Sequence, residues 1–167
     1  MLRVPSYEEL SKEQDEVYNL PLDGNYLVIG PPGTGKTIMA MHRAARFTHA
    51  KGSNLFLTRG KPLAQYLDQA VGVMGSGGVA YTLHSWLPQW YDKYFHRKPP
   101  MKAEWEFDFL QILLDIETAG KEGRYFSRLN HIVVDEGQDF AKELYLVLRR
   151  IADHITVFAD EKSALVR

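Results

Sequence analysis

Cysteine is absent from the 167 residues of this sequence. Disulfide bonds, thiolate catalysis and cysteine-ligated zinc are therefore excluded. Long hydrophobic stretches are absent as well, because no run approaches the ~18 consecutive apolar residues that cross a membrane. The N-terminal residues, MLRVP, do not resemble a signal peptide. We therefore expect a cytoplasmic protein that has no membrane partner.

Net charge is also small, since 20 lysines and arginines nearly balance 21 aspartates and glutamates to give −1. This balance provides no overall attraction to nucleic acid or to an anionic membrane, so binding of a polyanion must come from a local patch. A chain of this length that is 45% hydrophobic can bury one substantial core. We therefore predict a single domain over residues 1–167.

A phosphate-binding loop is predicted at residues 30–37. Their sequence, GPPGTGKT, matches G-x-x-x-x-G-K-[ST] and directly follows an apolar run at 26–29, which predicts a strand. The glycines allow successive N–H groups to point at a phosphate, and a helix that begins near Lys36 adds the positive end of its dipole. Lys36 would reach the β- and γ-phosphates, and the Thr37 hydroxyl would coordinate Mg²⁺. We expect nucleotide contacts from Gly33, Thr34, Gly35, Lys36 and Thr37, and a turn that binds nothing is the alternative.

The other half of such a site is predicted at residues 131–139. The apolar residues 131–134 predict a strand, and the sequence DEGQD follows at 135–139. Asp135 would hold a water of the Mg²⁺ shell, and Glu136 would orient and deprotonate the water that attacks the γ-phosphate. A solvated acidic turn is the alternative, but the phosphate loop about a hundred residues upstream favours the catalytic interpretation.

Hydrophobic periodicity predicts strands that alternate with helices along the chain. The predicted strands cover 26–29, 55–58, 79–82, 131–134 and 155–159, and the predicted helices include 6–18, 35–50, 103–119 and 144–151. In the helix at 35–50, Arg43 and Arg46 are assigned to the solvated face and to no chemistry. We therefore predict an α/β fold with a buried parallel sheet.

Two groups of residues have open interpretations. At the carboxyl end of the strand at 55–58, Thr58, Arg59 and Lys61 either grip a phosphodiester backbone or form an ordinary strand-to-helix turn. Aromatic and cationic side chains also alternate over 86–100, as they do in single-strand binders. The aromatic residues repeat there at i, i+4 and i+8, however, which favours the core side of a helix.

Gln14 also has two interpretations. Ser11 and Gln14 have the spacing of a capping box, and Ser6 with Glu9 offers the same arrangement one turn earlier. Alternatively, the side-chain amide of Gln14 can pair with the N6 and N7 edge of adenine. Composition alone leaves both interpretations open.

With these motifs in order, residues 10–165 resemble the first RecA-like motor lobe of a superfamily 1 helicase of the UvrD/Rep-like group. Residues 30–37 match motif I of that group, and DEGQD at 135–139 fits the D-E-x-Q-D form of its motif II. These two matches are highly specific. The weaker similarities are those of residues 10–14 to the Q motif, 58–63 to motif Ia, 82–86 to the next DNA-facing motif and 158–161 to motif III.

The resemblance implies a P-loop NTPase with a RecA-like parallel sheet, helices on both faces and a small helical accessory insertion at about 87–128. ATP and Mg²⁺ would bind at the sheet edge, and single-stranded DNA, favoured over RNA, would cross the strand ends. Gln14 would read adenine. The catalytic residues would be Lys36, Glu136 and Gln138, and Gln138 would couple nucleotide to DNA. The aromatic cluster would form the insertion's own small core. The residues that face DNA would be Thr58, Arg59, Lys61, His84 and Trp86.

Two departures from the family limit the expected activity. Ser163 stands where motif III usually has a glutamine that senses the γ-phosphate. The sequence also stops at Arg167, where the family continues into a second RecA-like lobe whose arginines reach the γ-phosphate. We therefore expect this chain, whether a fragment or a naturally short protein, to bind ATP, hydrolyse it poorly and unwind no DNA alone. The alternatives are a nucleotide-dependent binding module without turnover and a small P-loop phosphotransferase, which has no use for D-E-x-Q-D.

Overall fold

The chain folds around a five-stranded parallel sheet. A computed structural model describes residues 5–49, 53–60 and 80–161. The strands are β1 (Tyr26–Gly30), β2 (Asn54–Thr58), β3 (Ala80–Thr82), β6 (Leu129–Val134) and β7 (Ala152–Asp160), in the order β1-β7-β6-β2-β3. Every pairing between neighbours in this sheet is parallel. The predicted α/β fold of RecA type, with a phosphate loop after its first strand, is confirmed.

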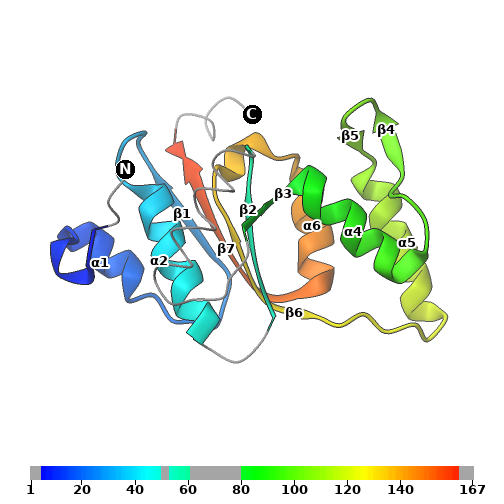
Figure 1. Ribbon diagram of the computed structural model, residues 1–167, viewed down its shortest axis with the longest axis horizontal. Coiled ribbons are helices and arrows are strands. Elements are labelled where there is room, and N and C mark those ends of the chain that lie inside the picture. Colours follow the sequence, from blue (N-terminus) through cyan, green and yellow to red (C-terminus); the bar gives the residue numbers. More distant parts are fainter. Residues whose placement is uncertain (1–4, 50–52, 61–79, 162–167) are drawn as a thin grey trace.

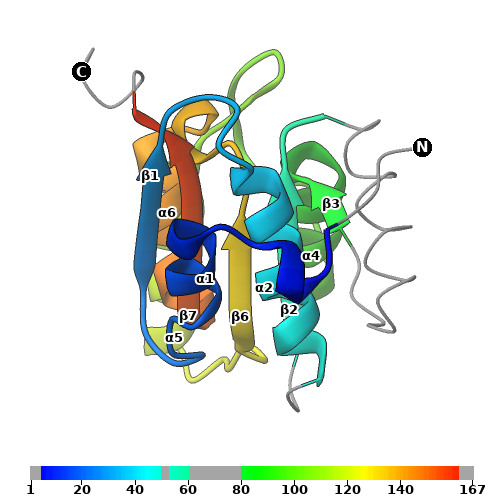
Figure 2. The ribbon, with the colours of Figure 1, turned by 90° about the vertical axis from the view of Figure 1, so that its left-hand side faces the viewer.

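Helices cover both faces of this sheet (Figure 1, Figure 2). On one face lie α1 (Lys12–Tyr18) and α2 (Lys36–His49), and on the other lie α4 (Leu83–Phe95), α5 (Phe109–Lys121) and α6 (Lys142–Ile151). Short 3-10 turns, η1 (Tyr7–Glu9) and η2 (Gly137–Asp139), precede α1 and follow β6. Within the described ranges, no helix combines the length and the apolar character needed to cross a membrane.

Alternate strand residues supply two hydrophobic cores, one on each face of the sheet. Leu55 and Leu57 of β2 pack in the core that includes α4 and α6, whereas Phe56 between them packs in the core that includes α2. Ile132 and Val133 of β6 divide between the two cores in the same way. Because both faces are covered, these strands are continuous apolar runs in the sequence rather than alternating patterns.

Two successive caps start the helical segment predicted at 6–18. Ser6 donates its backbone N–H to the Glu9 carboxylate at 2.7 Å, at the start of η1. Ser11 and Gln14 exchange two hydrogen bonds, of 3.0 and 3.2 Å, at the start of α1. The two helix starts that the sequence offers are therefore both used, with an extended residue between them.

The helix predicted at 103–119 begins later than expected. Its first part forms an antiparallel hairpin of β4 (Met101–Ala103) and β5 (Glu106–Phe107). Trp105, between these strands, has a φ of 62°, a left-handed conformation that a right-handed helix does not contain. Asp108 then caps α5, because its side chain accepts a hydrogen bond from the backbone N–H three residues on at 3.0 Å. The predicted start was wrong because this local turn and cap override the helical periodicity.

The aromatic residues of α4 belong to the main core. Trp86, Trp90 and Tyr91 lie in the same buried cluster as Leu144 of α6 and residues of β2 and β6. Helix α5 also packs directly on α6. The aromatic rings within 87–128 contact one another, but they are part of this main cluster. The expectation that the insertion has a separate small core is therefore wrong.

Arg43 is buried, contrary to its predicted place on the solvated face of α2. The residue is only 3% exposed, and its guanidinium donates to the Thr156 hydroxyl and to the Pro21 carbonyl oxygen, each at 2.7 Å. Burial, with the nearby charge of Arg46, lowers the pKa of Arg43 to about 10, which keeps it charged at neutral pH. Arg46 is itself partly buried and donates to a carbonyl oxygen at the end of α1. Both predictions of a solvated side chain were wrong because α1 and the segment before β1 fold over this part of α2.

Replacing Gly137 with alanine is expected to destabilise the protein by about 1–3 kcal/mol. A Cβ at this position in η2 would clash with Val157 Cγ1 and would lie 2.9 Å from the Tyr145 hydroxyl oxygen, so the side chains of Val157 and Tyr145 must shift. Urea unfolding measures the loss. The matched control is Gly120→Ala in α5, where a Cβ would meet nothing within 4 Å and the change should stabilise by up to about 1 kcal/mol. Equal stabilities of the two variants would contradict this packing.

Candidate nucleotide-binding site

The phosphate loop lies between the end of β1 and the start of α2. Gly33 and Gly35 have φ values of 79° and 80°, which are left-handed conformations that favour glycine. A Cβ on Gly33 would meet nothing within 4 Å, so the loop opens onto free space there. The loop leads into the N-terminus of α2, a helix of 14 residues whose dipole favours an anion. The backbone therefore forms a cradle suited to a phosphate.

Lys36 folds back over this loop. Its Nζ donates to the carbonyl oxygens of Gly30 at 2.9 Å and Pro31 at 2.6 Å, and it forms an ion pair with Asp160 Oδ1 at 2.9 Å. Asp160 is the last residue of β7, and the pairing of β7 with β1 places it opposite Gly30. The carboxylate of Asp160 therefore stands beside the first residue of the phosphate loop.

Thr37 and Asp135 meet although 98 residues separate them in the sequence. The Thr37 hydroxyl donates to Asp135 Oδ2 at 2.8 Å. Asp135, which follows β6, is 2% exposed, and burial raises its pKa to about 6 against the opposing effect of the Thr37 hydrogen bond. A hydroxyl and a carboxylate so placed are the oxygen ligands that Mg²⁺ takes in P-loop NTPases, so these residues fit that ion.

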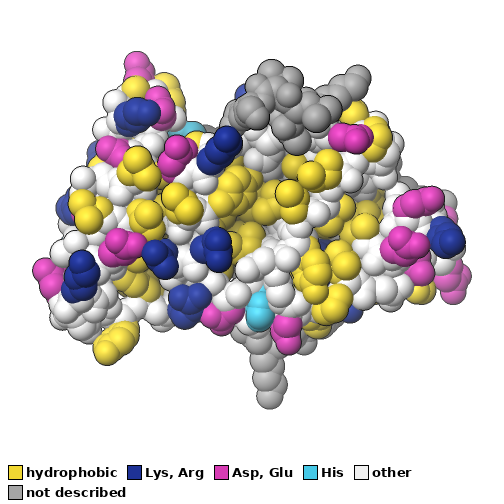
Figure 3. All heavy atoms as spheres, turned by 180° about the vertical axis from the view of Figure 1, so that it is seen from behind, with side chains coloured by type: hydrophobic (Ala, Val, Ile, Leu, Met, Phe, Trp, Pro, Cys, Tyr) yellow, Lys and Arg dark blue, Asp and Glu magenta, His cyan; other side chains and the backbone are white. Residues whose placement is uncertain are grey.

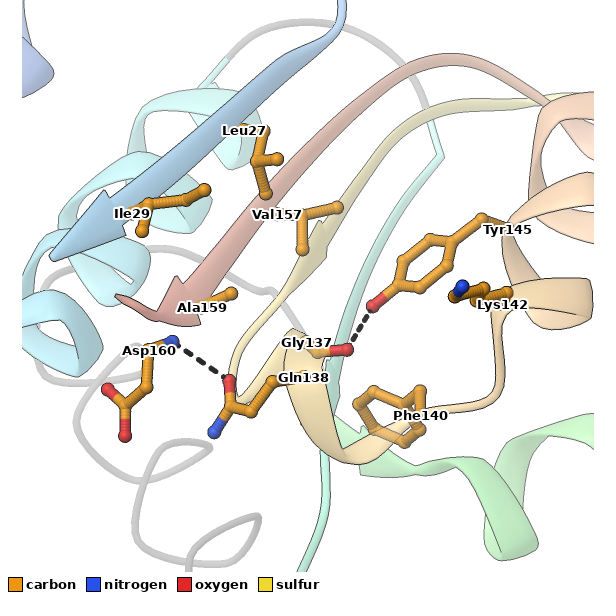
Figure 4. Close-up of a pocket in the computed structure, with 10 residues that line it drawn as sticks. All are labelled: Leu27, Ile29, Gly137, Gln138, Phe140, Lys142, Tyr145, Val157, Ala159 and Asp160. Carbon is orange, nitrogen blue, oxygen red and sulfur yellow. Dashed lines mark hydrogen bonds between the residues drawn. The ribbon is translucent and has the colours of Figure 1, made fainter. Parts of the chain in front are cut away.

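Glu136 is held in an uncommon backbone conformation beside Gln138. Its φ and ψ are 54° and 43°, in the left-handed region where residues other than glycine are strained. Gln138 Nε2 donates to Glu136 Oε2 at 2.6 Å, and Gln138 Oε1 accepts a hydrogen bond from the Asp160 N–H at 3.1 Å. Figure 4 shows this second bond between η2 and the end of β7. Gln138 therefore links the candidate general base to the strand that contacts Lys36.

Gln14 contacts the phosphate loop directly. Its Oε1 accepts a hydrogen bond from the Ser11 N–H at 3.0 Å, and its Nε2 donates to the Thr34 carbonyl oxygen at 3.2 Å. A pocket of about 150 Å³ lies between α1 and the loop, and Gln14, Val17 and Pro31 are among its lining residues. Gln14 therefore caps α1 and braces the loop at the same time. Adenine recognition by Gln14 stays a prediction.

Among the described residues of the set predicted to face nucleic acid, Arg59 and His84 are exposed. Arg59, just after β2, forms an ion pair with Asp139 of η2 at 2.9 Å. His84, in the first turn of α4, is exposed, and its Nε2 shares a hydrogen bond of 2.8 Å with the Trp105 carbonyl oxygen. Because β2 and β3 are neighbours, both residues lie at the carboxyl edge of the same part of the sheet.

Thr58 and Trp86, from the same set, are buried. Thr58 is 0% exposed, and its hydroxyl has no hydrogen-bond partner within the part of the chain that the structure describes. Trp86 is 8% exposed and packs against Trp90 with ring centroids 6.0 Å apart. In this conformation neither side chain is open to a large ligand, and their contact with nucleic acid stays a prediction. Lys61 and Ser163 lie outside the described residues.

An apolar pocket of about 390 Å³ adjoins Gln138 and Asp160. Figure 4 shows it between β1, β7, η2 and α6. Strand β1 is at the edge of the sheet, and its Leu27 and Ile29 are 62% and 46% exposed where they line this pocket. Seen from behind, hydrophobic side chains gather in the middle of this face (Figure 3). The site is therefore polar on the side of the phosphate loop and apolar on the side of α6.

Asp160 is a member of the site that sequence reasoning missed. Its signal was present, because a carboxylate follows the predicted strand at 155–159. The sequence pattern did not say which strand lies next to β1, however, and only the order β1-β7-β6 brings Asp160 to Lys36.

The AAA domain family has a sequence model that matches residues 14–162, which include the phosphate loop, DEGQD and β7. The chain belongs to this family. A search of curated proteins returned no significant match. The match and the geometry of the loop agree that this AAA domain has a P-loop NTPase fold.

In metal-free buffer, replacing Asp135 with asparagine is expected to stabilise this AAA domain at pH 7.5 by roughly 1–3 kcal/mol. The pKa of Asp135 is raised from 3.8 to about 6, so the folded protein binds more protons than the unfolded chain between these values. Stability from this group therefore falls as pH rises through that range. Asparagine carries no charge and can still accept the Thr37 hydrogen bond. Urea unfolding at pH 7.5 and at pH 4 measures the gain, which should vanish at the lower pH.

The matched control is Asp153→Asn. Its exposed carboxylate pairs with Arg128 at 2.7 Å, and loss of such a surface pair should change stability by less than about 1 kcal/mol at either pH. An Asp135→Asn variant less stable than the wild type at pH 7.5 would show that the buried carboxylate does not cost stability.

Proposed function

We propose that this AAA domain is the first motor lobe of a superfamily 1 helicase, which binds and hydrolyses ATP and acts on single-stranded DNA in the cytoplasm. The contact of 2.8 Å between Thr37 and Asp135 carries the proposal, because it joins the phosphate loop to the DEGQD segment. A bound Mg²⁺–nucleotide complex is contacted by both segments at once. The similarity of DEGQD to the motif II of that group favours a helicase motor over other P-loop proteins.

The residues of the site would divide the work of hydrolysis. The loop amides and Lys36 would bind the β- and γ-phosphates after Lys36 leaves its protein partners. Thr37 and Asp135 would hold Mg²⁺, which supplies positive charge at the phosphate oxygens when bound. Glu136 would accept the proton of the attacking water, and Gln138 would orient the Glu136 carboxylate through their hydrogen bond of 2.6 Å.

A single strand of DNA would cross the carboxyl ends of β2 and β3. Arg59 and His84 follow these neighbouring strands and are exposed, and ligands of open parallel sheets gather at that edge. The ion pair of Arg59 with Asp139 supports a coupling between the bound DNA strand and the nucleotide site. A DNA phosphate that binds Arg59 would compete with Asp139 and so act on η2. The choice of DNA over RNA rests on the family resemblance alone.

A second RecA-like lobe is proposed as the partner that completes hydrolysis. Within the described ranges, Lys36 is the one cation that hydrogen bonds to the phosphate loop. An arginine that reaches the γ-phosphate contributes ~10³–10⁵ to the rate in related NTPases. We therefore propose that this chain binds ATP by itself and turns it over slowly.

A module that binds ATP without turnover is the second candidate. One observation favours it, namely that the charged groups of the site already pair with protein partners. Lys36 pairs with Asp160, and the Glu136 carboxylate accepts from Gln138. ATP binding with no turnover, even after a second lobe is supplied, would favour this candidate over the motor.

Replacing Glu136 with glutamine is expected to lower ATP turnover by a factor of about 10²–10⁴. ATP binding should persist, because the Glu136 side chain is proposed to contact the attacking water and not the phosphates. Turnover is measured with and without oligo-dT, and binding is measured by titration calorimetry. The matched control is Glu143→Gln, which makes the same change at an exposed position in the first turn of α6.

In the wild type, oligo-dT should raise turnover more than oligo-U does. Unchanged turnover in the Glu136 variant would refute the choice of base. A wild type that binds no ATP would refute the proposed function.

A further inference from the structure

Protein groups alone satisfy the ammonium of Lys36. An ammonium has three donors, and Lys36 Nζ has acceptors at 2.9 Å in Gly30, 2.6 Å in Pro31 and 2.9 Å in Asp160. Of these acceptors, only the Asp160 carboxylate is charged. A phosphate can therefore gain Lys36 only if it displaces a protein partner, and Asp160 is the partner that holds it most strongly.

Asp160 is fixed in this place by the sheet. It ends β7, lies opposite Gly30 in the pairing with β1, and donates its N–H to Gln138 Oε1 at 3.1 Å. The side chains of Asp160 and Lys36 are 26% and 14% exposed, so water screens their attraction only in part. The carboxylate sits on a paired strand end, so it stays beside the loop when a ligand arrives.

We propose that Asp160 is a built-in counter-ion, which competes with the phosphates of a nucleotide for Lys36 and thereby lowers nucleotide affinity. This inference rests on the proposed function and adds to it a positioning residue that acts through Lys36. When phosphates bind, Lys36 moves from the Asp160 carboxylate to the ligand. When they leave, Lys36 returns to Asp160, so the same competition favours release of the product.

Asp160→Asn tests the proposal because asparagine keeps the shape and the backbone N–H but loses the charge. The dissociation constant of a fluorescent ADP analogue, titrated in the presence of Mg²⁺, should fall about three- to tenfold. Glu161→Gln removes the same charge at the next position, which is exposed, and should change the constant by less than about twofold. Damage to the fold would raise the dissociation constant. A lower dissociation constant in Asp160→Asn therefore cannot result from loss of structure.

Coupling between the two residues is the second measurement. Urea unfolding of Asp160→Asn, Lys36→Met and the double variant, all without nucleotide, should show non-additive losses, because each single change breaks the same ion pair. Additive losses, or an Asp160→Asn variant that binds the ADP analogue no more tightly than the wild type, would overturn the counter-ion role. A wild type that binds no nucleotide would instead overturn the proposed function, so the two failures are distinguishable.

Discussion

Parallel pairing of β7 with both β1 and β6 is the constraint on which the site depends. It brings the carboxyl ends of three strands to one edge of the sheet. The phosphate loop follows β1, Asp160 ends β7 and Asp135 follows β6. The hydrogen bond from Thr37 to Asp135 then closes the loop against the acidic segment. Two hydrophobic cores, one on each face of the sheet, hold these strands in position. The polar edge is therefore positioned by apolar burial elsewhere in the molecule.

Several groups at this edge are held in states that cost stability. Asp135 is a buried carboxylate whose pKa burial raises to about 6, and Glu136 has a left-handed backbone. Desolvated and strained groups are typical of functional sites, because a ligand can use them without further reorganisation. Contacts away from the edge compensate for these costs. One is the buried Arg43, which ties α2 to β7 through the Thr156 hydroxyl.

Most strands and helices could be predicted because their signals are local. The strand predicted at 131–134 is part of β6, and the helix predicted at 144–151 is part of α6. The failures share a cause, which is that a distant segment or a single turn decides the outcome. The backbone turns at Trp105, although the hydrophobic periodicity of a helix continues through this residue. Arg43 of α2 is covered by the segment before β1, whose Pro21 carbonyl oxygen accepts its hydrogen bond. The place of Trp90 in the main core, which it shares with residues of α6 and the sheet, was decided in the same way.

The sequence by itself determined which residue types the candidate site contains, because the phosphate-loop pattern is defined by particular residue types at fixed local spacing. The GPPGTGKT and DEGQD motifs therefore indicate the phosphate loop and the acidic segment from local sequence alone. Only the tertiary structure decided which charges meet. Lys36 with Asp160 and Arg59 with Asp139 are ion pairs across 124 and 80 residues of sequence. Contacts at such separations follow from strand order and packing, which no local pattern specifies.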